Sequence, residues 1–485
     1  MLTPAEEVGL AGHALAGRVR RAMLRLEGAP LAALVQRIRE EADQREMWYL
    51  REGEREAIRV LATPIPVMHE QLRYVHEVTW RLMQACRRLP SLYLADPAVR
   101  AVLRLTDGEE EWLHASWSPF HERHNPTFGR LDALADFRAP NWRETLQYLE
   151  PNLHGVGGLH LVPSAAEVVA AVMAPAIGVV EPELALAPTP DLRALLVEVL
   201  LGQLDALGDR GGAVALLEPL DAEDGPNDQE PLARHLREAY GLTVVHADPQ
   251  DLRCRHGEVW CGDVRVALAY RDYEVLDLVD LAAEGVDVSA MRLLFTQNRI
   301  VSPIGAEIDQ KACWEVFTDP VLAERHFSAE ERQAFARHVL WTRLLEDRRT
   351  TDPAGREVDL LEWVRRDREL LVLKPNRGYG GEGVMVGPAV TQATWESALD
   401  AALADEDDRW VVQRVATIPV YEFPARDEQG TLHEAPYHVV YGFAPTATGV
   451  AVLTRASQRQ VINVAQRGGL AAVMLGDRPV LAAAV

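Results

Sequence analysis

The stretch Leu371-Val-Leu-Lys-Pro-Asn-Arg-Gly-Tyr-Gly-Gly-Glu-Gly-Val384 joins a short apolar run to a turn that is dense in glycine. The apolar run predicts a strand, which delivers Lys374 to the start of the turn. The turn contains the glycines Gly378, Gly380, Gly381 and Gly383. Such glycines let backbone N–H groups approach an anion closely, and a lysine beside them supplies a charge for phosphate oxygens. A plain β-hairpin with a glycine turn fits this stretch equally well.

Lysine usage favours the phosphate interpretation. The chain has 50 lysine and arginine residues, and Lys311 and Lys374 are the two lysines among them. Arginine is therefore used wherever any cation suffices. A position that keeps lysine indicates a site that needs a compact, flexible ammonium group, which a guanidinium cannot replace. Both lysines lie in segments typical of nucleotide sites.

The composition is that of a soluble globular enzyme. With 485 residues, 48% hydrophobic and 25% charged, the chain is long enough for two or three domains. Its net charge of −23 argues against a general nucleic-acid binder and gives no reason to expect an anionic membrane as partner. The four cysteines show no metal-binding spacing and are expected to be reduced thiols.

Targeting signals are not found in the sequence. The N-terminus lacks a basic region followed by an apolar one, and no run reaches the roughly 18 apolar residues of a membrane span. The sequence therefore predicts a cytoplasmic protein without a membrane partner.

Hydrophobic periodicity divides the chain into four regions of an α/β (α+β) protein. Residues 1–120 have apolar positions three and four apart and are expected to be helical. Residues 121–208 hold a hairpin and two helices, at 164–173 and 190–207. Residues 209–305 show a strand–helix–strand order, which predicts a small parallel sheet. Residues 306–485 carry both lysines; here helices are expected around Lys311 and around Trp341 and Leu345.

The hairpin places polar side chains in a pattern that suits a metal ion. Residues 128–135 and 145–152 alternate between apolar and polar, with a turn between them. Because strand side chains have period two, each strand carries two polar side chains on one face: Arg130 with Asp132, and Glu150 with Asn152. Carboxylate and amide oxygens are ligands that Mg²⁺ takes, with phosphates and waters in its other positions. The alternative is a solvated outer face of an edge hairpin.

Two further segments can each be interpreted in two ways. Arg271 follows a strand at its C-terminal end, where open α/β sheets present ligand-binding groups, and it could hold a substrate carboxylate or be a surface arginine. The segment with Asn463 and Gln466-Arg-Gly-Gly469 could fold over a nucleotide or form a surface turn.

Taken in order, these motifs resemble the circularly permuted ATP-grasp family, which includes the eukaryotic-type glutathione synthetases and glutathionylspermidine synthase. Gly129-Arg-Leu-Asp132 followed by Leu149-Glu-Pro-Asn152 resembles the family's metal-binding segment. Lys311 resembles its first nucleotide lysine, and Lys374 with the glycine turn resembles its second lysine and phosphate-covering loop. Val411-Val-Gln-Arg-Val415 resembles the hinge strand at adenine. The resemblance covers roughly residues 115–475.

The resemblance implies a circularly permuted ATP-grasp fold with a small parallel-sheet pre-ATP-grasp domain and a helical N-terminal region. It implies ATP and Mg²⁺ as cofactors. The phosphates of ATP would bind to Lys311, Lys374 and the glycines Gly378, Gly380, Gly381 and Gly383, and the adenine would bind to Gln413 and Val415. Mg²⁺ would bind to Asp132, Glu150 and Asn152, and the acyl phosphate would be stabilised by Arg130, Arg271 and Lys374. The chain departs from the family pattern in two places: Leu153-His154 follows Asn152, where many relatives have an aspartate, and Arg414 stands in the hinge, where an acidic residue is common.

The implied reaction is ATP-dependent ligation of a carboxylate and an amine through an acyl phosphate. The expected substrates are small amino-acid-like or peptide-like molecules, and a homodimer is the default assembly. Two alternatives remain: a degenerate ATP-grasp protein that binds a nucleotide or a partner without ligating, and an ATP-dependent phosphotransferase or hydrolase.

Overall fold

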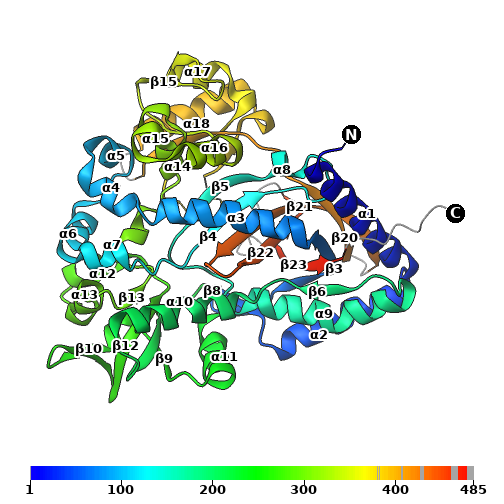
Figure 1. The fold of residues 1–485 in the computed structure, drawn as a ribbon, viewed down its shortest axis with the longest axis horizontal. Coiled ribbons are helices and arrows are strands. Elements are labelled where there is room, and N and C mark those ends of the chain that lie inside the picture. The colour runs from blue at the N-terminus through cyan, green and yellow to red at the C-terminus, as the bar shows by residue number, and fades with distance from the viewer. Residues whose placement is uncertain are drawn as a thin grey trace.

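A mixed sheet of eight strands runs through the middle of the protein in the computed structural model (Figure 1). The structure describes residues 2–378, 381, 383–405, 408–426, 431–459 and 468–477, so Gly380, Asn463 and Gln466 lie outside the described residues. The main path of the sheet, in order, is β3 (Arg59–Met68), β23 (Gly469–Gly476), β22 (Val450–Ser457), β21 (Leu432–Pro445), β4 (Arg130–Leu134) and β5 (Gln147–Asn152). In addition, β20 (Val420–Arg426) pairs with β21, and β6 (Leu186–Pro188) pairs with β23.

Long helices cover this sheet. They are α1 (Pro4–Arg25), α2 (Ala29–Gln44), α3 (His69–Cys86) and α9 (Leu161–Val180). The helix α3 contacts β3, β21 and β22 through apolar residues such as Val75 and Leu82, which are fully buried. Among the described residues, α9 is the single helix long and apolar enough to cross a membrane, and it packs on β3 and β23. Core burial therefore accounts for its apolar face.

The N-terminal region is not entirely helical, so this expectation is wrong for residues 48–68. Three strands lie there: β1 (Trp48–Arg51), β2 (Glu54–Ala57) and β3. Pro64 and Pro66 in β3 cannot donate the backbone hydrogen bonds of a helix interior. Instead β3 pairs in parallel with β23, and β1 pairs with β8 (Gly225–Pro226).

The predicted small parallel sheet is confirmed; it forms the lower lobe in Figure 1. Its parallel strands are β9 (Val244–Ala247), β7 (Ala213–Leu217), β12 (Val264–Arg271) and β13 (Ile300–Val301), with β10 (Leu252–Arg255) and β11 (Glu258–Cys261) as an antiparallel edge. The accompanying helices are α10 (Leu192–Leu207), α11 (Gln229–Tyr240), α12 (Val275–Ala283) and α13 (Ser289–Thr296). The helices expected at 164–173 and 190–207 correspond to α9 and α10.

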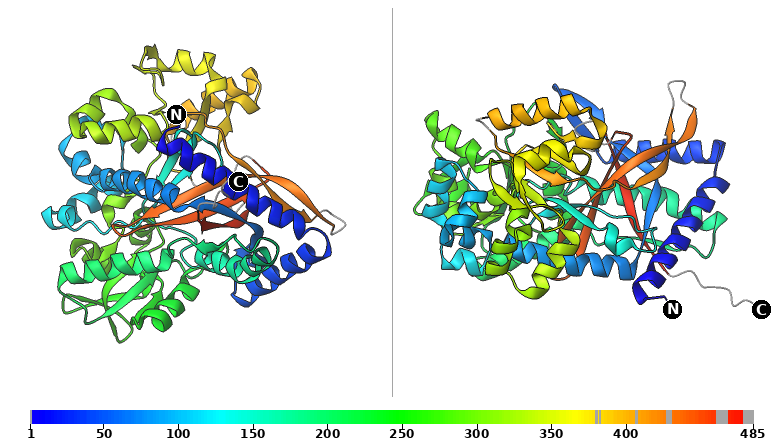
Figure 2. Two further views of the ribbon diagram at one scale, coloured as in Figure 1. Left: turned by 45° about the vertical axis from the view of Figure 1, so that its right-hand side comes forward. Right: turned by 90° about the horizontal axis from the view of Figure 1, so that it is seen from above.

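A separate upper lobe, coloured yellow to orange, carries Lys374 (Figures 1 and 2). Its antiparallel sheet has the order β14 (Thr342–Leu344), β19 (Trp410–Arg414), β17 (Leu371–Pro375) and β18 (Met385–Val386). Two helices, α17 (Leu360–Arg366) and α18 (Gln392–Ala404), pack on it around the buried Trp341, Trp363 and Trp395. A hairpin of β15 (Arg349–Thr351) and β16 (Glu357–Asp359) completes the lobe.

The helix expected around Trp341 and Leu345 is absent; these residues flank the strand β14 instead. Residues four apart share a face in both a helix and a strand, so this spacing did not distinguish the two. The side chains of Trp341 and Leu345 lie in the core of the upper lobe, whereas that of Leu344 lies in the core that includes the central sheet. Side chains that point in this way to two opposite faces are typical of a strand.

Short helices lie on the left of Figure 1 and within the upper part of the molecule, beside α17 and α18. They are α4 (Leu89–Ala95), α5 (Pro97–Val102), α6 (Asp107–Ser116), α7 (Pro119–Arg123), α14 (Cys313–Thr318), α15 (Pro320–His326) and α16 (Ala329–His338), and α8 (Trp142–Thr145) links β4 to β5. The helix expected around Lys311 begins later, at Cys313, so that Lys311 lies in the turn before it.

Candidate active site

A cavity of about 960 Å³ lies where the central sheet, the upper lobe and the small parallel sheet meet. It is lined by eight of the predicted site residues: Arg130, Asp132, Glu150, Asn152, Lys374, Gly381, Gln413 and Val415. The cavity is large enough for a nucleotide together with small substrates.

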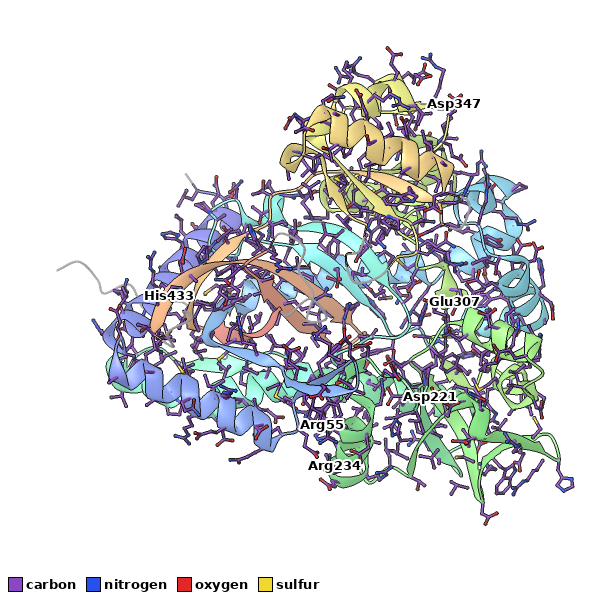
Figure 3. The ribbon with its side chains drawn as sticks, turned by 180° about the vertical axis from the view of Figure 1, so that it is seen from behind. Arg55, Asp221, Arg234, Glu307, Asp347 and His433 are labelled. Atoms are coloured by element: carbon purple, nitrogen blue, oxygen red, sulfur yellow. The ribbon has the colours of Figure 1, made fainter. Side chains whose placement is uncertain are left out.

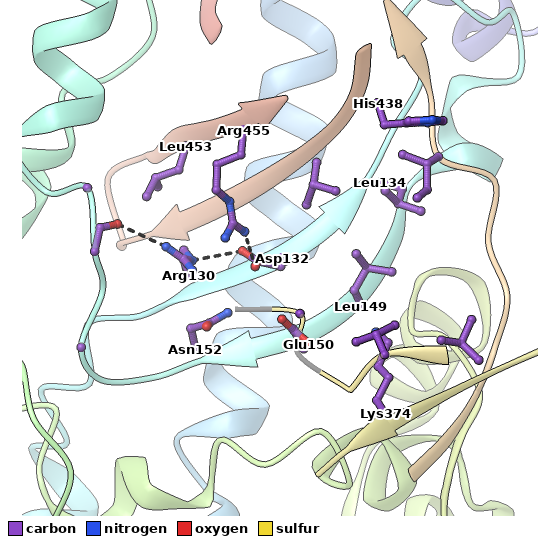
Figure 4. A pocket seen from close by; sticks show the side chains of 18 of the residues that line it. Arg130, Asp132, Leu134, Leu149, Glu150, Asn152, Lys374, His438, Leu453 and Arg455 are labelled. Atoms are coloured by element: carbon purple, nitrogen blue, oxygen red, sulfur yellow. Dashed lines mark hydrogen bonds and ion pairs between the residues drawn. The ribbon is translucent and has the colours of Figure 1, made fainter. Parts of the chain in front are cut away.

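The β4–β5 hairpin provides the polar floor of this cavity (Figure 4). Arg130 and Asp132 share a face of β4, and Glu150 and Asn152 share a face of β5, as predicted; the register pairs Arg130 with Asn152 and Asp132 with Glu150, which brings the two sets together. On the other side of β4, Gly442 of β21 lies opposite Asp132. A Cβ atom at Gly442 would come within 2.9 Å of Asp132 Oδ1, so the absence of a side chain there makes room for the carboxylate.

Asp132 is held between two arginines. Its Oδ1 accepts a hydrogen bond of 3.1 Å from Arg130 Nε, and its Oδ2 accepts one from Arg455 Nη2 (Figure 4). Burial alone would raise the pKa of Asp132, but the charges of Arg130 and Arg455 outweigh it and hold the pKa below its usual value. The sequence argument did not assign Arg455 to the site, although it ends an apolar strand. The carboxylate keeps two guanidinium groups side by side at the cavity wall.

Lys374 projects from β17 and is 8% exposed. Its ammonium donates a 2.9 Å hydrogen bond to Gln413 Oε1, and the Gln413 amide donates to the backbone oxygen of Leu149 and to Thr342 Oγ1. Gln413 therefore positions the lysine, a role that the resemblance to a hinge strand did not suggest. Burial lowers the pKa of Lys374, and the nearby Lys311 adds to this, while Glu150 opposes it.

Lys311 also lies near Glu150. Its Nζ is 3.8 Å from Glu150 Oε2 and donates a 2.6 Å hydrogen bond to the backbone oxygen of Gly378. It lines a small adjoining cavity of about 10 Å³ that Glu150 and Asn152 share. The structure thus brings both lysines near one carboxylate.

Some of the described glycines in the turn have the positive φ angle that was predicted for them. Gly381 and Gly383 have positive φ angles of 77° and 69°, which favour glycine. Gly381 lines the main cavity, whereas Gly378 contributes its carbonyl group to Lys311. At Gly383 a Cβ atom would come within 2.8 Å of Pro375 Cγ. Gly380 is outside the described residues.

Arg271 does not line the cavity, and the prediction that it holds a substrate carboxylate is corrected. Its side chain is fully buried, and its Nη1 lies 2.6 Å from Oε1 of Glu307, which is labelled in Figure 3. The guanidinium also donates to the backbone oxygens of Ser302 and Tyr273, at 2.7 and 2.8 Å. The Glu307 carboxylate neutralises the charge of Arg271, and the backbone oxygens accept its N–H groups. Arg271 therefore has a structural role: it connects the end of β12 to the segment after β13.

Arg271→Lys is expected to lower the free energy of unfolding by about 1–2 kcal/mol, because an ammonium cannot reproduce the fork of hydrogen bonds to two carbonyl groups. Denaturant titration measures this loss, and the KM of any carboxylate that the protein is found to use should stay unchanged. A raised KM with unaltered stability would instead restore Arg271 to substrate binding.

A third wall of the cavity comes from the small parallel sheet and is acidic. Asp272, Glu274 and Asp277 line it, His154 from the segment after β5 lies beside them, and the sequence argument assigned none of the four a role. The loop before α9 is held there by Asp228, whose carboxylate accepts hydrogen bonds of 2.8 to 3.0 Å from four successive backbone N–H groups, at residues 158–161.

His154 is buried in this wall. Its Nε2 is 3.5 Å from Asp309 Oδ1. Burial lowers its pKa, but Asp309 and Glu307 overcome this and raise the pKa to about 8. His154 is therefore largely cationic near neutral pH, with its charge directed to two buried carboxylates.

The hairpin residues fit a phosphate-bound Mg²⁺ ion. Within the described part of the chain, no group of three His, Cys, Asp or Glu side chains could hold a metal ion alone. A Mg²⁺ ion that binds with phosphates needs one or two protein carboxylates. Glu150 has its nearest described cation at 3.8 Å, so its carboxylate is available to such an ion, whereas Asp132 is shared with two arginines. Asn152 lines the same cavity beside Glu150, and its amide oxygen is the atom that would contact the ion.

Comparison with known proteins identifies the fold. No family model and no curated protein matches the sequence. Among solved structures, a glutathione synthetase-like effector from Globodera pallida, in its apo form, matches with a TM-score of 0.62 and 12% identity, over 93% of this chain and 99% of that one. An ATP-grasp RimK domain protein from Sphaerobacter thermophilus matches 51% of this chain and 91% of its own length, with 16% identity and a TM-score of 0.25. The chain therefore shares the fold of the glutathione synthetase-like effector, as the resemblance to glutathione synthetases predicted, while the circular permutation stays a prediction.

Proposed function

We propose that this protein is an ATP-dependent ligase that joins a carboxylate to an amine through an acyl phosphate. One observation carries the proposal: Lys311, Lys374, Arg130 and Arg455 gather around Asp132 and Glu150, four cations about two carboxylates. The chain as a whole has a net charge of −23, so a locally cationic wall indicates an anionic ligand. The glutathione synthetase-like fold supports a ligase of this type.

In this proposal the protein positions the phosphates and neutralises their charge. Lys374, fixed by Gln413, and Lys311, fixed by the carbonyl group of Gly378, would hold phosphate oxygens. Glu150 and Asn152 would hold Mg²⁺, which supplies charge neutralisation when bound. The guanidinium groups of Arg130 and Arg455 would bind the substrate carboxylate and the negative charge that develops on it. The glycine turn beside Lys374 would exclude water from the acyl phosphate.

ADP release tests this function directly. We expect ADP to form at a substantial rate when Mg²⁺, ATP, a carboxylate and an amine are all present, with an amide as product. Omission of either organic substrate should reduce the rate to background. A phosphotransferase would require one organic substrate and would leave a stable phosphorylated product, which mass spectrometry would detect.

Nucleotide binding gives a prediction that does not depend on the organic substrates. Mg²⁺ with a non-hydrolysable ATP analogue should raise the unfolding midpoint, because a ligand at 100 times its Kd adds about 2.7 kcal/mol to the free energy of unfolding. EDTA should remove most of this rise if Glu150 and Asn152 bind the metal with the phosphates. Thermal unfolding with and without EDTA measures it. No shift at millimolar nucleotide would contradict an ATP site, and a shift without turnover on any substrate pair would support the non-ligating alternative.

A further inference from the structure

One end of the cavity is apolar. Its lining comes from β1 and the residue before β3, from the start of α9, and from β22 and β23. The side chains that form this apolar end are Tyr49, Ile58, Leu161, Val162, Leu453 and Leu470. The ATP chemistry proposed above uses the upper lobe, the β4–β5 hairpin and Arg455, and leaves the apolar end without a role.

The side chains of the apolar end adjoin one another. Five of the six belong to one small cluster, which packs α2 and α9 against β3 and β23. The sixth, Leu453, joins this cluster at Gly158, where a Cβ atom would come within 3.0 Å of Val162 Cγ2 and 3.6 Å of Leu453 Cδ2. The apolar end is therefore a continuous surface.

Two arginines stand at the border of the apolar end. The strand register pairs Arg455 with Leu470, and Leu453 lies two residues before Arg455, so these side chains share one face of the sheet. Arg130 reaches the same place across Gly442, where a Cβ atom would come within 3.0 Å of Arg130 Cδ and 3.4 Å of Leu453 Cβ. Figure 4 shows Leu453 and Arg455 side by side, near Arg130.

The strand order arranges the groups of the site in sequence across the sheet. Glu150 and Asn152 are on β5, Arg130 is on β4, Arg455 is on β22 and Leu470 is on β23. Neighbouring strands are about 4.8 Å apart, so β5 and β23 are separated by roughly 19 Å. A molecule that the arginines hold with its reacting end toward β5 therefore extends its other end into the apolar end.

The charge at this border favours an acid. Within the described ranges, Arg130 and Arg455 share Asp132 as their one close carboxylate. The two guanidinium groups thus have more positive charge than this contact neutralises, and a substrate carboxylate would balance it. A few polar groups beside an apolar surface are the usual composition of a small-molecule site.

Core packing is the ordinary explanation for part of the apolar end. Ile58, Leu161 and Leu470 are buried in the small cluster and would be apolar in any case. Packing does not account for Tyr49 and Val162, which are half-buried and also line the cavity. Part of their apolar surface is therefore left for a ligand.

We propose that the carboxylate substrate carries a hydrocarbon group, which binds in the apolar end while Arg130 and Arg455 hold its carboxylate. The inference rests on the proposed ligase function and specifies its acid. In the ligation, the carboxylate gains a phosphoryl group from ATP with release of ADP. The amine then displaces phosphate from the acyl carbon with loss of one N–H proton, and the hydrocarbon group serves recognition alone. An acid with a second charge at its far end is disfavoured, because the six side chains there provide no counter-charge.

Three acids that differ at the far end test this subsite without turnover. The probes are butanoate, hexanoate and adipate, measured by calorimetry on the full chain in the presence of Mg²⁺ and the ATP analogue. Hexanoate should bind about 10-fold more tightly than butanoate, because each buried CH₂ group is worth about a factor of four. Adipate has the same number of carbons as hexanoate and a second carboxylate, and it should bind at least about 10-fold more weakly than hexanoate. Equal affinities for butanoate and hexanoate, adipate binding as tight as that of hexanoate, or no binding of any of the three would overturn the proposal.

Val162→Thr exchanges a methyl group of the apolar end for a hydroxyl group and should weaken hexanoate binding by about 5-fold. Val179→Thr is the matched control, because Val179 is 80% exposed near the other end of α9 and does not line the cavity. A retained thermal shift with Mg²⁺ and the ATP analogue would show that both variants are folded. Arg455→Gln should weaken hexanoate and butanoate alike, by about 10-fold, because it removes a charge that holds the carboxylate. If Val162→Thr and Arg455→Gln both leave these affinities unchanged, the apolar end serves packing alone and the proposal fails.

Hydroxylamine separates the subsite from the ligase function. It stands in for the unidentified amine, since its nitrogen attacks the acyl carbon of an acyl phosphate, displaces phosphate and leaves a hydroxamate. We expect the hydroxamate of hexanoate to form together with ADP. Tight binding of hexanoate without hydroxamate or ADP would contradict the ligase function and not the subsite. A higher kcat/KM for adipate than for hexanoate would contradict the subsite and not the ligase function.

Discussion

Lys374→Arg is expected to reduce the rate of ADP release by roughly 100-fold or more while the protein stays folded, because a misplacement of about 1 Å at a reacting centre costs about this factor. Lys374 is 8% exposed, and its ammonium lies 2.9 Å from Gln413 Oε1. A guanidinium is longer and planar, so it would displace Gln413 or project past the phosphate position. Because arginine keeps the positive charge, the predicted loss of rate would come from the changed position and shape of the cationic group.

Arg366→Lys is a suitable control, because Arg366 is on the surface of α17 and pairs with the adjacent Asp367. It should leave the rate unchanged, and circular dichroism should show both variants folded. A Lys374→Arg protein that keeps most of the original rate would disprove the assigned role of Lys374.

Glu150→Gln should raise the Mg²⁺ concentration for half-maximal activity by about 10- to 100-fold, the range found when the support of a metal ligand is lost. Glu150 is paired with Asp132 across the hairpin, and its nearest described cation is Lys311 at 3.8 Å. The amide keeps the shape of the side chain and removes the charge. A Mg²⁺ titration of ADP release measures the change.

Glu144→Gln is the matched control for that titration. Glu144 lies just before β5, pairs with Arg337 at the surface and does not line the cavity. Its variant should have an unchanged Mg²⁺ midpoint. If Glu150→Gln also leaves the midpoint unchanged, Glu150 is not a metal ligand.

Local patterns in the sequence predicted much of the site. The alternation in 128–135 and 145–152 was sufficient to place Arg130 and Asp132 on one face and Glu150 and Asn152 on one face of the partner strand. The strand–helix–strand order predicted the parallel sheet, because both signals arise from neighbouring residues. The scarcity of lysine directed attention to Lys311 and Lys374, and the structure places both near Glu150.

Features that depend on distant pairing were not predictable in this way. No local pattern shows that Glu307 takes the charge of Arg271, or that Arg455 shares Asp132 with Arg130. The four-residue spacing of Trp341 and Leu345 fits a helix and a strand alike, and the structure has a strand there. In residues 48–68, the two prolines of β3 were a usable signal against a helix.

The parallel pairing of β3 with β23 has a consequence for how the chain is made. This pairing joins Leu61 to Ala471 and Val67 to Leu475, so nearly the whole chain must be synthesised before the strand finds its partner. Contacts of such long range slow folding, and an unpaired strand edge promotes association with other chains in the meantime. During translation, α1 and α3 are available early to shield β3, since both pack on it and both are synthesised long before β23. A fragment that ends before residue 469 would lack the partner strand and is expected to aggregate during expression.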